Sequence, residues 1–372
     1  MNSVKSVEAA IDPNNRLTFL LDWELTMKCN LECDYCESGL HGGRDNSTAH
    51  PPVEECLRAI DFMFSYAEQA ISNKKSGLKA VVLNVYGGES LHHPKIVEIL
   101  QAVHQRYAAR PRTWSLKVTT TTNLIVSQKK LLDIIPLIDK FIVSYHTRNT
   151  DRQKQQFKNN ILLLKQHQRD IKCSVLMHSD PERFADSQQF IEWCQQNNIV
   201  SFPKQLDGNP NSTRHSASHN YQTQQVLWFK NIYDTNSVRT QSSISIDNSA
   251  DKLILQGRPC CGGRQLSVDQ NYRQRNIFVN NNFHGWHCSV DQFFLFIKQV
   301  NGEIYVNKDC KMNYQGDIGP IGNLSDTAAI LKQQRQGTPT IVCAKTQCLC
   351  GLCAPKAKDV ADFNKIMLKY QA

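Results

Sequence analysis

Three cysteines stand close together near the amino end of the sequence, at Cys29, Cys33 and Cys36. An apolar run comes directly before them. A structural zinc site closes its tetrahedron with four protein ligands, whereas a metal centre that performs chemistry keeps one position open. Three thiols would likewise leave one iron of a four-iron cluster to another ligand. A zinc knuckle with a distant fourth ligand, or a chance grouping among the 14 cysteines of the chain, is the alternative.

A second short motif, Gly87-Gly88-Glu89, follows a β-rich run at residues 80–86. On its own this motif is a common turn. It is informative here because it ends the strand that follows the cysteine loop. The C-x3-C-x2-C spacing, the aromatic Tyr35 before the last cysteine and the Gly-Gly-Glu turn together resemble the motifs of the radical SAM enzymes.

The resemblance implies that the three cysteines hold a [4Fe–4S] cluster whose fourth iron is chelated by S-adenosylmethionine. It implies that Glu89 receives the methionine ammonium of this cofactor, while the two glycines let the backbone approach. By position, Asn123 and Ser144 resemble polar residues that contact the ribose or the methionine carboxylate. We therefore expect Tyr35, Gly87, Gly88, Glu89, Asn123 and Ser144 to bind the cofactor.

Strand-like and helix-like segments alternate along the first 207 residues. The predicted strands are 16–26, 80–86, 114–121, 140–145, 173–178 and 199–206, and the predicted helices between them are 53–67, 96–107, 128–135, 154–168 and 185–196. This alternation predicts an α/β fold in which a parallel sheet curves into a whole or partial barrel. Six strands, with the cysteine loop after the first, match the partial (β/α)6 TIM-like barrel of the radical SAM core. An eight-stranded barrel would need two more repeats, which the sequence after residue 207 does not supply.

Active sites of parallel barrels lie at the carboxyl ends of the strands. Four further polar residues end predicted strands, namely His146, His178, Gln205 and Asp207. We expect them to face the substrate. For each, the alternative is an ordinary strand-end group that a neighbouring loop satisfies, and His178 could equally cap a helix.

A second group of cysteines follows residue 256. Its members are Cys260, Cys261, Cys288, Cys310, Cys343, Cys348, Cys350 and Cys353. Strand-like runs at 293–300 and 303–306 flank Asn301-Gly302, a strong hairpin signal. A final helix is predicted near 360–370.

This region resembles the SPASM and twitch extensions of radical SAM enzymes, which carry auxiliary iron–sulfur clusters. The gap from Gly302 to Cys310 is longer than usual, and the distal cysteines do not have the SPASM spacing. We favour at least one auxiliary [4Fe–4S] cluster held by Cys288, Cys310 and two of the four distal thiols, with Cys260 or Cys261 as a further candidate ligand. A zinc ribbon is the alternative.

Composition and length set further limits. The 372 residues predict a tail at 1–15, a core at 16–207, a linker or bridging region at 208–255 and a small cysteine-rich auxiliary-cluster domain at 256–372. Neither a secretory signal nor a membrane span is evident, which predicts a soluble, cytoplasmic protein whose thiols bind metal. The net charge of +9 could attract nucleic acid or an acidic substrate, but a solvated surface explains it as well.

The resemblance implies reductive cleavage of S-adenosylmethionine to a 5′-deoxyadenosyl radical that abstracts hydrogen from a substrate. A redox-sensing cluster protein would not need the Gly-Gly-Glu turn. Enzymes with such extensions most often modify peptides or proteins, including ribosomally made precursors, so we expect a peptide substrate and an oxidoreductase or maturase activity. A sugar, a nucleoside or RNA is the alternative. A peptide substrate could need a separate leader-binding protein, and the electron would come from a donor such as flavodoxin or ferredoxin.

Overall fold

The computed structural model describes residues 17–33, 36, 45–72, 78–111, 113–206, 221–237, 284–308, 310, 312–337, 340–344 and 356–369. Six of its strands lie side by side in the order of the sequence, each parallel to the next. These strands are β1 (Leu17–Thr26), β2 (Leu78–Gly87), β3 (Ser115–Thr122), β4 (Lys140–Tyr145), β5 (Asp170–Met177) and β6 (Ser201–Gln205).

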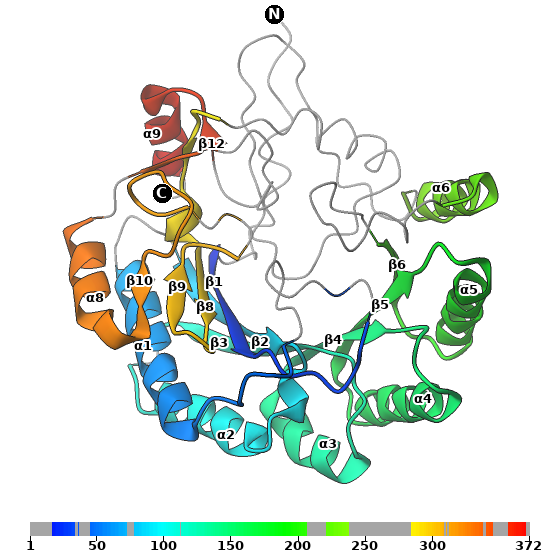
Figure 1. Cartoon of the computed structure of the whole chain (residues 1–372). Helices are drawn as coiled ribbons and strands as arrows, with labels where there is room; N and C mark the ends of the chain where they lie inside the picture. The colour runs from blue at the N-terminus through cyan, green and yellow to red at the C-terminus, as the bar shows by residue number, and fades with distance from the viewer. Residues whose placement is uncertain are drawn as a thin grey trace, which may run out of the picture.

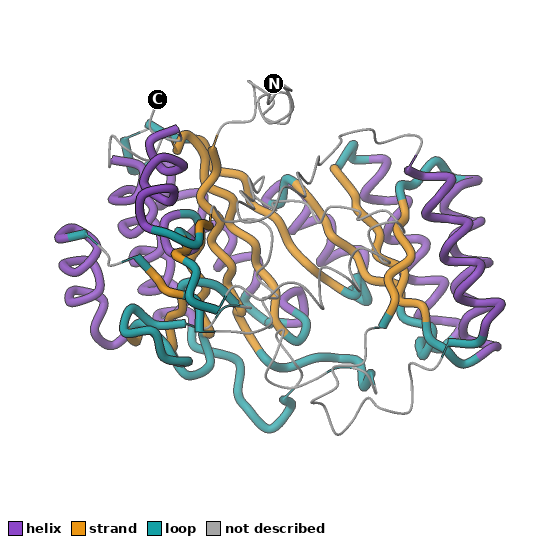
Figure 2. Tube along the Cα trace, turned by 90° about the horizontal axis from the view of Figure 1, so that it is seen from above, coloured by secondary structure: helices purple, strands orange, loops and turns teal. Residues whose placement is uncertain are grey.

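Helices follow these strands and cover the outside of the sheet. They are α1 (Val53–Ser72), α2 (Ile96–Ala108), α3 (Gln128–Ile134), α4 (Asp151–Gln166), α5 (Pro181–Gln196) and α6 (Thr223–Ser237). The strands form an open arc with the helices around it (Figure 1), and the neighbouring strands also run together in the second view (Figure 2). The predicted α/β fold with a partial TIM-like barrel is confirmed.

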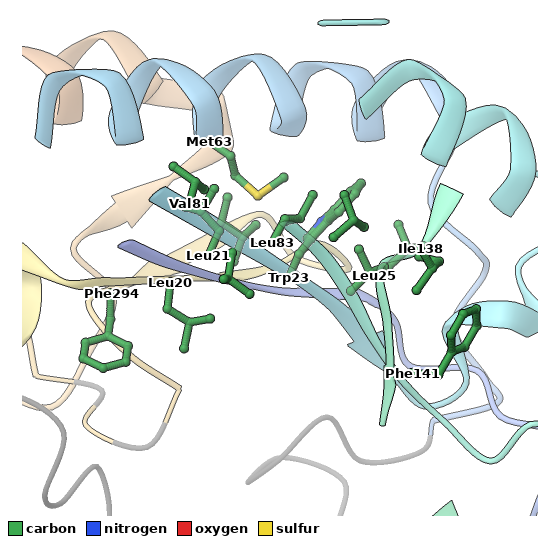
Figure 3. Packing of buried hydrophobic residues seen from close by; sticks show 14 of the residues in the cluster. Leu20, Leu21, Trp23, Leu25, Met63, Val81, Leu83, Ile138, Phe141 and Phe294 are labelled. Atoms are coloured by element: carbon green, nitrogen blue, oxygen red, sulfur yellow. The ribbon is translucent and has the colours of Figure 1, made fainter. Parts of the chain in front are cut away.

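The core between sheet and helices explains why the first strand is so apolar. Leu21, Trp23 and Leu25 have no exposed surface and point toward the helical layer, where Met63 of α1 lies near Leu21 (Figure 3). Leu20 points to the opposite face of the sheet. Alternation along β1 thus assigns its odd-numbered residues to the core and its even-numbered residues to the barrel interior.

The predicted hairpin around Asn301-Gly302 is confirmed, but it extends the core sheet rather than forming a sheet of its own. Its strands are β8 (Phe294–Lys298) and β9 (Glu303–Tyr305), followed by β10 (Gly322–Asn323). β8 pairs with β1 in parallel, so the sheet has nine strands in the order β10-β9-β8-β1-β2-β3-β4-β5-β6. The edge of β1 would otherwise present unpaired backbone groups, which the hairpin satisfies.

Helix α6 lies in the segment predicted as a linker, yet it packs as the sixth helix of the barrel. The Tyr221 hydroxyl, just before the helix, donates to the Met177 carbonyl at 2.7 Å, and Gln225 Nε2 donates to the Ser179 carbonyl at 3.0 Å. The rings of Phe184 and Trp228 meet edge to face at 5.2 Å. The structure therefore fastens α6 to α5 and to the carboxyl end of β5.

A second, three-stranded sheet lies in the cysteine-rich region. It is formed by β7 (His287–Cys288) between β11 (Ile341–Val342) and β12 (Lys356–Ala357), both antiparallel to it. The predicted final helix is present as α9 (Val360–Lys369), and α8 (Thr327–Gln336) packs on α1. Every helix within the described part of the chain is too short or too polar to cross a lipid bilayer.

Candidate cofactor-binding site

The cysteine loop begins where β1 ends, and the Gly-Gly-Glu turn holds its first residues. The Gly88 N–H donates to the Thr26 carbonyl at 2.7 Å, and the Glu89 N–H donates to the Lys28 carbonyl at 2.8 Å. A Cβ on Gly88 would lie 2.5 Å from the carbonyl oxygens of both Met27 and Lys28. Two chains can approach this closely only where a residue has no side chain.

Gly87 is constrained in the same way. Its φ of +153° is a conformation that other residues rarely adopt, and a Cβ there would lie 2.0 Å from the Thr26 carbonyl oxygen. The resemblance to the radical SAM motif implied that these glycines let backbone approach at this turn. The structure identifies one partner of that approach as the chain that enters the cysteine loop.

Glu89 joins three segments through its carboxylate. Its Oε1 accepts from the Leu91 N–H at 3.0 Å and from the Thr122 hydroxyl at 2.7 Å, and its Oε2 accepts from the Asn123 N–H at 2.6 Å. The residue is 2% exposed. A carboxylate has about four lone-pair positions, so these three bonds leave about one for a ligand. The fastening of β2 to the end of β3 is a role of Glu89 that the sequence did not reveal.

Burial raises the pKa of Glu89 from 4.5 to about 6, although the bonds from Thr122, Asn123 and Leu91 favour the charged form. The folded protein thus binds more protons than the unfolded chain between these pH values. Stability should fall as the pH rises from about 4.5 to about 6, by up to ~2 kcal/mol for this group.

Glu89→Gln cannot ionise, so the variant should lose this part of the pH dependence. The amide nitrogen of the variant side chain would also face a hydrogen-bond donor where the carboxylate oxygen had accepted. This mismatch lowers the free energy of unfolding at every pH. Urea unfolding of both proteins between pH 4.5 and pH 7 measures the two effects. An equal slope in parent and variant would contradict the assignment.

Asn123 connects the end of β3 to the cysteine loop. Its Nδ2 donates to Asn30 Oδ1 at 2.8 Å and lies 3.8 Å from Cys29 Sγ. Asn30 Nδ2 in turn donates to the Ile125 carbonyl at 3.0 Å. Asn30 was not singled out from the sequence, although it stands inside the cysteine motif and bonds this loop to Asn123 and to the segment after β3.

The three thiols of the cysteine loop are half-buried. Burial, together with the charges of Glu89, Cys33 and Cys36, raises the pKa of Cys29 to about 12. A metal centre would offset this cost, because coordination to a cation deprotonates a thiol. The donor set therefore fits an iron–sulfur cluster, for which thiolates are the usual ligands.

The loop thiols do not form a closed site by themselves. Among the residues that the structure describes, no three side chains of His, Cys, Asp and Glu have the arrangement of a metal-ion site. Tyr35 lies outside the described residues, as do Cys260, Cys261, Cys348, Cys350 and Cys353.

His146 lies beside the cysteine loop, with its Nδ1 3.3 Å from Cys33 Sγ. Burial lowers the pKa of His146 to about 4, so its imidazole is neutral near pH 7. Ser144 lies two positions earlier, on β4, and is partly buried. The ring of Tyr145 stacks on that of Phe190 of α5, with the ring centres 3.8 Å apart, so Tyr145 faces the helical layer. Because side chains alternate along a strand, Ser144 faces the barrel interior.

The remaining strand-end residues have other surroundings. His178 Nδ1 accepts from the N–H of Asp180 at 2.9 Å, and Asp180 caps the first turn of α5. This contact supports the alternative in which His178 shapes a helix start. Gln205 is the last residue of β6 and pairs with Met177, and Asp207 lies outside the described residues.

The auxiliary thiols that the structure describes are buried. Cys288, Cys310 and Cys343 are 3%, 4% and 5% exposed. The Cys343 N–H donates to the Trp286 carbonyl at 2.9 Å, which sets this thiol beside the strand that carries Cys288. Residues 287 and 288 also pair with β12, directly after the distal cysteines. The small sheet therefore brings Cys288 close to Cys343 and to residues 356–357.

The barrel interior next to β1 carries polar residues that the sequence analysis overlooked. Asp22 and Glu24 are each 3% exposed. Asn84 Nδ2 donates to Asp22 Oδ1 at 2.8 Å, and Lys308 Nζ lies 4.0 Å from Asp22 Oδ2 and 5.3 Å from the ring centre of Tyr86. Buried carboxylates are rare unless they are paired. The signal was the strict alternation of acidic and apolar residues within a run interpreted as wholly buried.

Comparison with models of known protein families finds no match, and the search of curated proteins finds none either. Solved structures do match. SuiB of Streptococcus suis bound to S-adenosylmethionine has a TM-score of 0.47 at 13% identity, over 78% of this chain and 60% of SuiB. The chain thus spans about 60% of the length of SuiB.

Two anSMEcpe structures match over 95% of this chain and 96% of theirs. The one with bound AdoMet and Cp18Cys peptide has a TM-score of 0.50 at 10% identity. The histidine-tagged one with bound AdoMet has a TM-score of 0.51 at 11% identity. Identities this low establish the fold alone. The chain therefore has the fold of the radical SAM enzymes.

Proposed function

We propose that this protein is a radical SAM enzyme that modifies a peptide or a protein side chain or backbone. The observation that carries the proposal is the joining of three motifs at one end of the sheet. The loop of Cys29 is bonded to the Gly-Gly-Glu turn through Thr26 and Lys28, and to the end of β3 through Asn123. The carboxyl ends of parallel strands are where such folds place their chemistry.

In this proposal Cys29, Cys33 and Cys36 hold a [4Fe–4S] cluster. Such a cluster, once reduced, would supply the electron for the cleavage of S-adenosylmethionine to methionine and a 5′-deoxyadenosyl radical. Glu89 would accept from the methionine ammonium through its remaining lone pair, a charge-assisted contact. The neutral imidazole of His146 would border the cluster loop without adding a charge. Asn123 and Ser144 would contact the rest of the cofactor.

The peptide substrate is the finer part of the proposal. It draws support from the anSMEcpe structure that contains a bound Cp18Cys peptide. In this chain, Cys288, Cys310 and thiols of the distal group would hold an auxiliary cluster. The buried side chains of Asp22, Glu24 and Tyr86, in and beside β1, would border the substrate. The electron would enter from a small redox protein such as flavodoxin or ferredoxin, and a separate leader-binding protein could present the peptide.

Anaerobic reconstitution with iron and sulfide, followed by dithionite and S-adenosylmethionine, tests the reaction class. We expect release of 5′-deoxyadenosine, measured by chromatography with mass detection. A fully reconstituted protein that releases none would overturn the proposal. Deuterium passed to 5′-deoxyadenosine from a deuterated candidate peptide would support the peptide class. Transfer only from a deuterated nucleoside or sugar would replace that class.

A further inference from the structure

A groove lined by polar residues lies on the outside of the barrel, between the start of α3 and the first half of α4, which are neighbours in Figure 1. Its volume is about 450 Å³, within the range of ligand sites. Its lining residues are Gln128, Arg152, Gln155, Gln156, Asn159 and Asn160. They comprise five carboxamides and one guanidinium, and none of them is aromatic or aliphatic. The proposed cofactor site uses none of these residues.

Five of the six lining residues form one stripe along α4. They recur at positions 152, 155, 156, 159 and 160, the spacing of a single helix face. With a rise of about 1.5 Å per residue, this stripe is about 12 Å long. An extended chain covers this length with roughly four residues. Carboxamides both donate and accept hydrogen bonds, as a peptide backbone does.

Asn160 supplies an independent sign of a ligand. It has no exposed surface, and its Nδ2 donates to the carbonyls of Leu124 at 2.9 Å and Val126 at 2.8 Å. Within the described chain its Oδ1 has no hydrogen-bond partner. Since Nδ2 already faces two carbonyls, turning the amide round would not solve this. Asn160 is one of the residues that line the groove, and a donor from a ligand bound there would satisfy its carbonyl.

We propose that this groove binds an extended, acidic peptide segment. Backbone N–H groups of the segment would bond to Asn160 and the glutamines, and a carboxylate would pair with Arg152. A nucleic acid would need several cations for its phosphates, whereas the described lining of the groove offers one. The inference deepens the proposed function, on which it rests for the choice of a peptide: the groove would hold a segment of the substrate outside the barrel, at a distance from the bond that reacts.

A ligand in this groove would also lie behind the cysteine loop. Gln156 Nε2 donates to the Val126 carbonyl at 2.8 Å, so α4 holds the connection from β3 to α3 through both Gln156 and Asn160. The same connection accepts the bond from Asn30 at the Ile125 carbonyl. Binding should therefore slow hydrogen exchange in residues 124–127.

Fluorescence anisotropy with a labelled hexapeptide of alternating Ala and Asp tests the proposal. Arg152→Glu should weaken its binding roughly five- to tenfold, because an attraction becomes a repulsion at an exposed site. Methylating the backbone nitrogens of the probe should weaken binding to the parent protein as well. Arg58→Glu, an exposed change of the same kind on α1, is the matched control and should bind as the parent does.

Equal binding of the acidic probe by parent and Arg152→Glu would overturn the proposal. It would also be overturned if the parent bound a hexapeptide of alternating Ala and Lys as tightly as the acidic probe, or if it bound no probe at all. Arg152→Glu should still release 5′-deoxyadenosine at the parental rate without peptide. The two proposals therefore fail separately. If binding of the acidic probe does not depend on Arg152 while the cofactor is still cleaved, the groove proposal is wrong. If the parent protein does not cleave the cofactor, the proposed function is wrong.

Discussion

Changing Cys29, Cys33 and Cys36 together to Ala is expected to remove about four irons per chain and to abolish the release of 5′-deoxyadenosine. The three thiols are the half-buried donors of one loop, and Asn30, Asn46 and the Gly-Gly-Glu turn fix its backbone. Their removal takes away the ligands and leaves these backbone bonds in place. Iron and sulfide analysis after anaerobic reconstitution, with dithionite-driven turnover, measures both losses.

Cys56→Ala is the matched control, because this thiol is wholly buried in α1 within the apolar core. It should keep its iron and its turnover while losing some stability to a small cavity. Iron beyond about four per chain in the parent should survive in the triple variant, since the auxiliary thiols are unchanged. A triple variant that keeps all its iron, or a reconstituted parent that holds zinc, would contradict the assignment.

Gly88→Ala is expected to damage both the fold and the cysteine loop through a single methyl group. The added Cβ would sit 2.5 Å from two backbone carbonyl oxygens, those of Met27 and Lys28. Backbone cannot rotate aside as a side chain does, so the segment entering the cysteine loop must shift. We expect a loss of ~1–3 kcal/mol in the free energy of unfolding, measured by urea titration. Cys29 follows Lys28 directly, so iron at this loop should fall sharply too.

Gly319→Ala provides the comparison. The nearest atom to its added Cβ is Asn313 Nδ2 at 3.8 Å, an ordinary contact. This variant should unfold at the parental urea concentration and bind iron as the parent does. If Gly88→Ala behaved in the same way, the close approach between the turn and the cysteine loop would not matter for the site.

Local sequence patterns were sufficient to predict the six core strands, most of the helices and the hairpin. Each is encoded within a short segment, by apolar period or by Asn301-Gly302 between two strand-like runs. The spacing of the three cysteines likewise indicated the chemistry, because ligand number and type belong to the segment itself. The sequence could not show that Glu89 uses most of its carboxylate on Thr122, Leu91 and Asn123.

The sequence by itself thus determined the order of the elements and the identity of the candidate ligands. Only the tertiary structure decided which distant segments meet. Trp23 donates to Gln299, 276 positions along the chain, and this contact accompanies the parallel pairing of β8 with β1. Asn160 likewise supports the loop after β3 from another helix. Such contacts depend on the packing of elements that lie far apart in sequence, so no local period or spacing encodes them.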